Sequence, residues 1–494
     1  MSVLCPASCV AALVLMYTQR RDRRLLASAP LIGAGLMCAI LVGYAAWRIF
    51  VWNVPVNNAD GRFVRGVLAL CSGFAMPLLV SWFGAILRQD LPRMARVLRS
   101  RRALLATLTG LVFAALYFAF GWQFETRGVL VHIDKLFDAD PLYQRSLYGV
   151  AIHTHTHPLL PLLWYIATRA VGVLAGAQWA ALAVNSLIGG VGVALAAAYF
   201  QIVMRSALHG LLAAAFLGST ASHVVFGAMP ESYIVSAATL VLLHLIVAQH
   251  GAPALRQRHI VLAGVLSIGV TITNIIPALV CYVFQTTARR RWATVLRWTA
   301  YSLLIGAFLL SAQAIVRPEA TPFEPGAYRH ERRFIDEDVS AGRRAMNVML
   351  GVMLQNVVGS TPVNGPDVGL PGVRAGFAYD KPAWIVVYVW GLASLVAFWL
   401  LVSGGRWRCR TFVAAGACLV LVVALHSVYA HEGLFLYSCQ FTFFVLAMLA
   451  HGLTGVHWRA ATAGLVVLLV ALVVNNLQFC ARVIATLDEI TAQS

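Results

Sequence analysis

The chain has 494 residues, of which 60% are hydrophobic and only 11% are charged, whereas a soluble domain carries about 25% charged residues. Repeated apolar segments of about 17–28 residues predict a polytopic helical membrane protein. Because these segments are continuous rather than alternating, a transmembrane β-barrel is excluded.

The net charge of +18 comes from arginine clusters between the apolar segments. Such clusters are typical of cytoplasmic loops, so we expect no nucleic-acid binding. Nine scattered cysteines without a Cys-x-x-Cys pair indicate neither a disulfide framework nor a zinc site. The first apolar segment, 4–16, precedes its arginines, which is the reverse of a secretory signal. We expect a retained span, and the compact loops without targeting motifs favour a bacterial inner membrane.

The N-terminal part, 1–102, is predicted to hold transmembrane helices, with spans at 25–51 and 63–87. The loops after the first and third spans are basic, and the loop between them carries little charge, so the two sides of the membrane alternate. The fourth span, 103–121, therefore delivers the polar loop 122–157 to the outer face.

Three apolar segments follow, at 158–176, 178–204 and 210–228. If all three cross the membrane, Glu231 lies inside. The first segment contains Arg169 and two prolines, which suits a helix at the outer interface better than a span. We favour this interfacial helix, which places Glu231 outside.

The apolar stretch 260–287 has basic residues at both ends, so both ends are expected inside. Its middle, Thr271 to Pro277, contains polar groups and a proline. This pattern predicts either a broken helix that returns as a hairpin or one long kinked helix. Broken backbone at membrane depth must be buried in protein or line a cavity, so a hairpin would place Asn274 beneath a site on the outer side.

A second long polar loop, 317–382, follows a span at 292–316 and is expected outside. The C-terminal part, 383–494, holds four further spans, at 383–403, 411–429, 434–454 and 459–479, and an outer tail. The predicted fold class is all-α, a transmembrane bundle of about 12–14 spans with two larger extracytoplasmic loops. No internal repeat is evident, so an inverted-repeat transporter is not supported.

Acidic and imidazole side chains gather on the outer face in this topology, where charged groups are costly and usually functional. Asp138 and Asp140 follow a span closely. A carboxylate in a dry outer cavity can act as a general base toward a hydroxyl. Asp140 also precedes a proline, which is equally the pattern of a helix N-cap.

His153, His155 and His157 alternate, so an extended chain presents them on one side. Three imidazoles could bind zinc, but no fourth ligand is fixed, and we expect no metal. Contacts to a phosphate, or a polar rim, are favoured instead. Glu231 begins a span, where it could face the aspartates or cap the helix.

Arginines of the second loop are candidates for holding a lipid phosphate, because a guanidinium fork matches phosphate oxygens. They are Arg329, Arg332, Arg333, Arg343, Arg344 and Arg374. The short outer loop near the C-terminus adds His431 and Glu432 to the polar groups on this face.

An acidic pair soon after a span, followed by a polar segment and a helix that begins at His157-Pro158, resembles the first external loop of the GT-C glycosyltransferases. This family includes protein mannosyltransferases and aminoarabinose transferases. The sequence FDADP, 137–141, stands where the family commonly has an Asp-Asp or Asp-Glu pair. Glu231 is similar to the second acidic position of the family. The resemblance makes 103–316 the catalytic transmembrane module.

The resemblance implies transfer of a sugar, with inversion and without a cofactor, from a polyprenyl-phosphate-linked donor to a hydroxyl of a glycan, lipid or protein at the outer face. Asp140, in preference to Asp138, would deprotonate the acceptor, and Glu231 would be the second catalytic acid. The expected substrate-binding residues are His153, His155, His157, Asn274, Arg374, His431 and Glu432. The alternatives are a transporter and a flippase-like or non-catalytic membrane protein.

Overall fold

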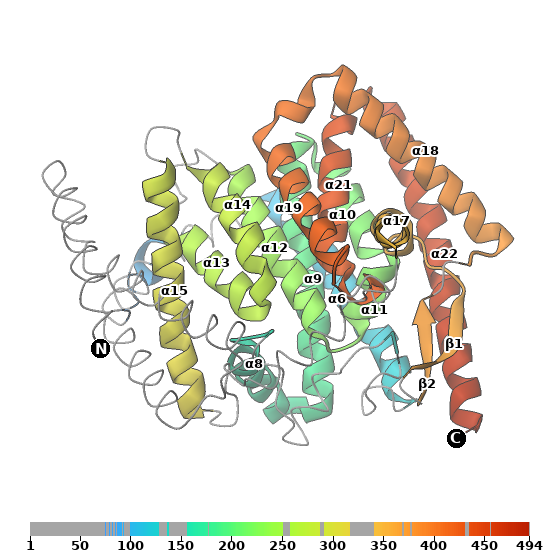
Figure 1. The fold of residues 1–494 in the computed structure, drawn as a ribbon, viewed down its shortest axis with the longest axis horizontal. Coiled ribbons are helices and arrows are strands. Elements are labelled where there is room, and N and C mark those ends of the chain that lie inside the picture. The colour runs from blue at the N-terminus through green and yellow to red at the C-terminus, as the bar shows by residue number, and fades with distance from the viewer. Residues whose placement is uncertain are drawn as a thin grey trace, which may run out of the picture.

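The computed structural model is drawn in Figure 1. It describes residues 99–127, 136–137, 156–175, 177–249, 257–286, 291–316, 340–367, 370–375, 378–429, 434–454 and 456–493, together with several residues between 75 and 92. The predicted spans before residue 63 lie outside the described residues.

Helices dominate the described part of the chain, and each apolar segment predicted there forms one helix or two. They are α6 (Arg101–Glu125), α8 (Leu160–Ala175), α9 (Ala177–Val203), α10 (Ala207–Gly218), α11 (Ala221–Ala228), α12 (Ser232–Ala248), α13 (Gln257–Val270), α14 (Ile275–Gln285), α15 (Arg291–Val316), α17 (Ala341–Leu350), α18 (Lys381–Ser403), α19 (Arg410–His426), α20 (Leu434–Tyr437), α21 (Cys439–Leu453) and α22 (Trp458–Gln493).

Five of the described helices are long and apolar enough to cross a membrane, or six if the bent pair α10 and α11 counts as one span. Six shorter apolar helices, among them α12 and α21, lie between them. The described residues therefore support an integral membrane protein. Several of the spans predicted in this part of the chain are short or interrupted helices, and the total of 12–14 spans stays a prediction because those before residue 63 lie outside the described residues.

The outward face of α18 is apolar, as expected of a helix that contacts lipid. Its most exposed large side chains are Ile385, Tyr388, Leu392, Leu395 and Trp399. Such a continuous apolar surface is unusual on a soluble monomer. The helix begins where Asp380 accepts a hydrogen bond from the Ala383 N–H, which satisfies one of its free backbone donors.

Small residues allow α6 and α9 to pack closely. A Cβ added at Gly110 would lie 2.5 Å from the Gly190 carbonyl oxygen, so neither position tolerates a side chain. Close backbone approach through glycine is the usual mode of helix packing in membranes. It fixes the C-terminal end of α6 beside the start of α9, where Trp122 stacks on Trp179 with ring centroids 4.2 Å apart.

Helix α8 is a short apolar helix whose two ends lie at the same end of the bundle, and the interfacial placement of 158–176 stays a prediction. Its first turn is tied to the end of α13 by the hydrogen bond from the Leu159 N–H to the Gly269 carbonyl, 2.7 Å. Its last residue is followed closely by the start of α9, beside the C-terminal end of α6. Both ends therefore lie at one end of the bundle, the lower end in Figure 1.

The stretch 260–287 folds as a hairpin rather than as one kinked helix. Helices α13 and α14 are separated by a 3₁₀ turn at Ile272–Asn274. A Cβ added at Gly264 would overlap the Tyr282 hydroxyl, whereas one continuous helix would hold these residues about 27 Å apart. The two helices therefore run back along each other, and the hydrogen bond from the Ile272 N–H to the Thr156 carbonyl places the tip beside the α8 segment.

The loop 317–382 contains a β-hairpin, so the all-α prediction misses one small element. Strands β1 (Pro362–Asp367) and β2 (Leu370–Ala375) pair antiparallel, with Pro362 opposite Ala375 and Asp367 opposite Leu370. The hairpin lies beside the C-terminal half of α22 (Figure 1).

A buried ion pair joins the basic loop near residue 90 to α13. The Arg258 Nε and Nη2 atoms donate to the two Asp90 carboxylate oxygens at 2.7 and 2.6 Å, and His259 Nε2 lies 3.0 Å from Asp90 Oδ2. We predict that Asp90→Asn destabilises the protein by about 3–5 kcal/mol, because it leaves the Arg258 charge buried without its partner. Thermal unfolding in detergent measures this. Asp488→Asn, which breaks the exposed pair with Arg127, should cost less than about 1 kcal/mol.

The same ion pair predicts acid sensitivity. Burial opposes ionisation of Asp90, but hydrogen bonds and charge from Arg258 and His259 outweigh it and lower the pKa of this carboxyl below its ordinary value. The stabilisation is therefore complete above the unfolded-state pKa, about 4, and is lost as the pH falls through the folded-state pKa. The melting temperature of the wild type should fall more steeply below pH 4 than that of Asp90→Asn, and parallel curves would contradict this assignment.

The close packing of α13 against α14 predicts that Gly264 does not tolerate a larger side chain. Gly264→Ala should destabilise the protein by about 1–3 kcal/mol, because the new methyl group displaces the Tyr282 hydroxyl from its 2.6 Å hydrogen bond with Ser302. The double variant Gly264→Ala/Tyr282→Leu should lose less than the sum of the single variants. Gly306→Ala is the matched control, because nothing lies within 4 Å of its added Cβ. Additive losses would exclude the contact.

Candidate functional site

The predicted site residues fall into three groups in the structure. Glu231, His157 and Asn274 are described, and Arg374 is described as part of strand β2. Asp138, Asp140, His153, His155, His431 and Glu432 lie outside the described residues. The candidate site is therefore built from the first group and from the described neighbours of the others.

Glu231 is the N-cap residue of α12, although its side chain makes no capping hydrogen bond to the helix backbone. Its position at the helix N-terminus fits the capping interpretation, in which a carboxylate interacts favourably with the helix dipole. The residue is only 4% exposed, and its Oε1 accepts a 3.1 Å hydrogen bond from the Ser232 hydroxyl. The structure thus holds this carboxylate in a buried setting, within hydrogen-bonding distance of a hydroxyl.

His157 extends this contact into a three-residue chain. Its Nδ1 lies 2.7 Å from the Val270 carbonyl oxygen, which can only accept, so Nδ1 carries a proton. The other ring nitrogen, Nε2, lies 3.4 Å from Ser232 Oγ. In the neutral ring Nε2 is an acceptor, and in the protonated ring it donates to Ser232, which donates in turn to Glu231. The geometry can therefore relay a proton between imidazole and carboxylate.

Asn185 positions this chain from α9. Its Nδ2 lies 2.9, 3.0 and 2.9 Å from the carbonyl oxygens of Phe226, Gly227 and Met229, which are at the end of α11. Its Oδ1 lies 3.4 Å from the Glu231 backbone nitrogen and accepts from that N–H. Sequence reasoning missed this residue, although a lone asparagine within the apolar segment 178–204 was a usable signal.

Asn274 lies at the tip of the α13–α14 hairpin, fully engaged with its neighbours. Its amide donates to Ser236 Oγ at 2.7 Å and to the Ser267 carbonyl at 3.2 Å. Ser236 is one helical turn along α12 from Ser232, so Asn274 contacts the same helix as the site, one turn deeper. The Asn274 amide therefore holds the hairpin to α12, and its expected role in substrate binding stays a prediction.

An aromatic cluster brings the remaining segments to Glu231. The backbone N–H of Phe137 donates to the Val373 carbonyl at 2.8 Å, and the Phe137 ring lies 4.9 Å from that of Phe435. The Phe226 ring contacts both Phe435 and Tyr233, with ring centroids 5.6 and 5.8 Å apart. Four segments far apart in the sequence therefore meet beside the start of α12.

Four described residues, here called the anchors, are close neighbours in the sequence of predicted site residues. Phe137 precedes Asp138, Val373 precedes Arg374, Thr156 follows His155, and Leu434 follows Glu432 by two positions. Among the described residues, no group of three or more His, Cys, Asp or Glu side chains has the arrangement of a metal site.

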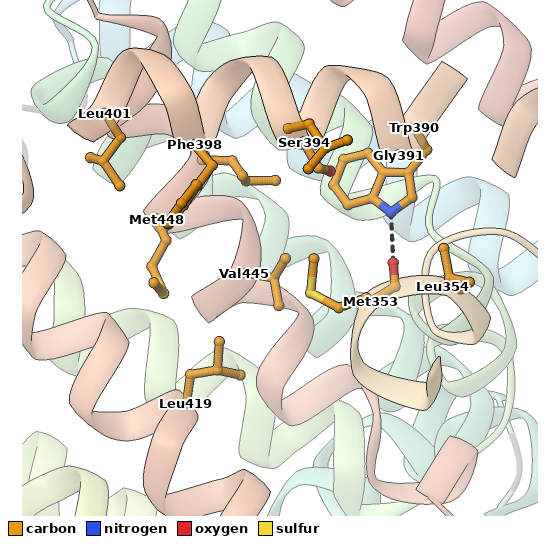
Figure 2. Close-up of a pocket in the computed structure, with 12 residues that line it drawn as sticks. Met353, Leu354, Trp390, Gly391, Ser394, Phe398, Leu401, Leu419, Val445 and Met448 are labelled. Carbon is orange, nitrogen blue, oxygen red and sulfur yellow. Dashed lines mark hydrogen bonds between the residues drawn. The ribbon is translucent and has the colours of Figure 1, made fainter. Parts of the chain in front are cut away.

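A separate apolar pocket of about 360 Å³ lies between α18, α19, α21 and the turn at Gly351–Gln355. Figure 2 shows Trp390, Phe398 and Met448 among its lining residues, with Trp390 Nε1 donating to the Met353 carbonyl at 2.6 Å. Its lining is almost wholly apolar, which suits a hydrocarbon chain and not a sugar.

Comparison with models of known protein families finds no match for this chain. Comparison with curated proteins finds no significant match either.

Proposed function

We propose that the chain is an integral-membrane glycosyltransferase that moves a sugar from a polyprenyl-phosphate-linked donor to an acceptor hydroxyl at the outer face of the membrane. One observation carries the proposal. The buried Glu231–Ser232–His157 chain lies beside the described anchors of every other segment expected to supply the site. Polar groups that converge at one end of an apolar bundle need a functional reason.

Phe137, the residue before Asp138, packs in the aromatic cluster at the start of α12. Asp138 and Asp140 follow Phe137 directly in the sequence, and this supports the proposal that an aspartate acts together with Glu231.

In the proposed reaction an aspartate, Asp140 in preference to Asp138, accepts the proton of the acceptor hydroxyl. The oxygen attacks the anomeric carbon in line as the bond from that carbon to the phosphate oxygen breaks, so the configuration inverts. The phosphate leaves with the electron pair of that bond, and cationic groups stabilise its charge. Glu231, held by Ser232 and through it by His157, orients the acceptor or the sugar hydroxyls.

The lipid carrier gives a physical reason for the apolar pocket. Cys439 packs in the same cluster as Phe137 and Phe435, and Val445, a pocket residue, is six residues further along α21. That separation is about 9 Å along a helix. A prenyl chain attached to a phosphate near Glu231 is long enough to reach the pocket, and its transfer from lipid is favoured by an apolar lining.

A transporter is the second candidate, and the bend between α10 and α11 favours it. The two helices meet at 66°, and Asn476 donates to the carbonyls of Ser219 and Val357 at this bend. Interrupted helices with polar groups at membrane depth are common at transporter binding sites. A transporter, unlike the proposed enzyme, would move its substrate without forming a glycosidic bond.

We predict that Asp140→Asn lowers sugar transfer by about 10²–10⁴-fold, the usual contribution of a general base. Asp138→Asn should have a smaller effect, and Glu231→Gln an intermediate one. The measurement is transfer from a panel of polyprenyl-phosphate hexoses and pentoses by membranes containing the full chain. Asp488→Asn, an exposed carboxylate at the same end of the bundle, is the control and should be fully active. Unchanged transfer by Asp140→Asn would end the proposed mechanism.

The proposed site requires the Glu231 end of the bundle to face outward. Cys409 is exposed in the turn between α18 and α19, at the opposite end in Figure 1, and Asp488 is exposed near the C-terminus. We predict that an impermeant maleimide labels Asp488→Cys in intact cells but labels Cys409 only after permeabilisation, with the labelled peptides identified by mass spectrometry. The reverse pattern would place the site in the cytoplasm and exclude the proposed donor.

A further inference from the structure

Arg482 has one edge of its guanidinium without a partner. This residue lies near the C-terminal end of α22, and its Nη1 donates to Asp380 Oδ2. Its Nε and Nη2 atoms are buried and have no hydrogen-bond partner among the described residues. The other oxygen of Asp380, Oδ1, accepts the Ala383 N–H at the start of α18.

Two other arginines show what this edge normally binds. Arg258 uses its Nε and Nη2 atoms together on the carboxylate of Asp90. Arg127 uses the same pair of atoms on the carboxylate of Asp488, at 2.6 and 3.3 Å. The Nε–Nη2 edge is a planar fork that matches two oxygens of one anion. In Arg482 the Nε–Nη2 fork has no hydrogen-bond partner among the described residues.

Further polar atoms without a partner among the described residues belong to α22 and to the two segments beside it. The hydroxyls of Ser360 and Tyr379 and the Oδ1 atom of Asn475 are buried without a hydrogen-bond partner in the described part of the chain. Ser360 and Asn475 are only 1% and 3% exposed. Leaving such groups unsatisfied costs free energy, so each calls for a ligand or water partner.

The backbone brings these groups together. The Thr361 N–H donates to the Ala378 carbonyl at 2.8 Å, so the segments at 359–361 and 378–380 lie side by side. Asn475 Nδ2 donates to the Gly359 carbonyl at 3.2 Å, and a Cβ added at Gly359 would overlap Phe479. Residues 475, 479 and 482 share one face of α22. Both segments therefore run along the face that carries Arg482.

The donors of Arg482, Ser360 and Tyr379 favour an anion as the ligand. Arg482 offers its fork, and Ser360 and Tyr379 each offer a hydroxyl. Burial raises the pKa of Tyr379, so its hydroxyl keeps its proton. These donors outnumber the two oxygens of a carboxylate and suit the three terminal oxygens of a phosphate monoester. The Arg482 side chain is 28% exposed, so an anion can approach it from the surface once the side chains over the fork move.

We propose that Arg482, Tyr379 and Ser360 form a binding site for a phosphate group at the Glu231 end of the bundle. The phosphate belongs either to a lipid headgroup or to free inorganic phosphate. In the reaction proposed above it would be the phosphate of the polyprenyl donor, and that assignment alone rests on the proposed function. None of these three residues was among the phosphate-binding candidates expected from the sequence.

The test is native mass spectrometry of the full-length protein in detergent, titrated separately with polyprenyl monophosphate, the matching polyprenol and inorganic phosphate. The wild type should bind polyprenyl monophosphate about tenfold more tightly than the polyprenol, and Arg482→Gln should abolish this preference. Arg482→Lys should keep part of it, and Tyr379→Phe should weaken it severalfold. Arg127→Gln is the matched control, because its fork is already occupied by Asp488, and should bind normally.

Asp380→Asn separates binding from stability. It weakens the Arg482 ion pair and should lower the melting temperature, yet it should keep or strengthen the preference for phosphate. Binding of inorganic phosphate that depends on Arg482, without a preference for the lipid, would support the site and identify free phosphate as its ligand. A phosphate preference unchanged in Arg482→Gln, or no phosphate binding by the wild type, would overturn the proposal.

These outcomes are distinguishable from failure of the proposed enzyme. If Arg482-dependent phosphate binding is found but no sugar is transferred, the site stands and the glycosyltransferase does not. If transfer depends on Asp140 but phosphate binding is unchanged in Arg482→Gln, the proposed glycosyltransferase activity is supported and the phosphate binds at another site.

Discussion

The described fold depends on satisfying backbone groups wherever a helix is interrupted inside an apolar bundle. No water is available there to replace lost hydrogen bonds, so each interruption must be repaired by protein. Three asparagines do this. Asn185 donates to the carbonyls at the end of α11, Asn476 donates at the bend between α10 and α11, and Asn274 donates to the Ser267 carbonyl at the hairpin tip.

These repairs create the polar end of the molecule as well as holding it together. Because α11 stops at Ala228, the chain reaches Glu231 in an extended conformation at the start of α12. Because α13 stops at Val270, the carbonyl of that residue is free to bind His157. The Glu231–Ser232–His157 chain thus exists because two helices end early, at positions that asparagines stabilise.

The sequence predicted this fold where polar residues interrupt an apolar segment visibly. Thr271 to Pro277 marked the hairpin, and Arg169 with two prolines distinguished the short helix α8 from a full-length span. The bend at Ser219 and Thr220 was not predicted, because two small polar residues hardly change the hydropathy of 210–228. Arg482 was also missed. It lies beyond the predicted end of the last span, 479, and its significance comes from Asp380, a hundred residues away, which no local pattern reveals.

The aromatic cluster separates the Glu231 carboxylate from the Arg482 guanidinium at one end of the bundle. Ring contacts run unbroken from Phe479, three residues before Arg482, through Phe435 and Phe226 to Tyr233, two residues after Glu231. These rings exclude water, which lowers the local dielectric and strengthens every remaining charge interaction. The rings also keep the two charged side chains on separate partners: Glu231 accepts from Ser232, and Arg482 donates to Asp380. A direct Arg482–Glu231 pair would replace both contacts, so the aromatic cluster keeps the Glu231–Ser232–His157 chain separate from the Arg482–Asp380 pair.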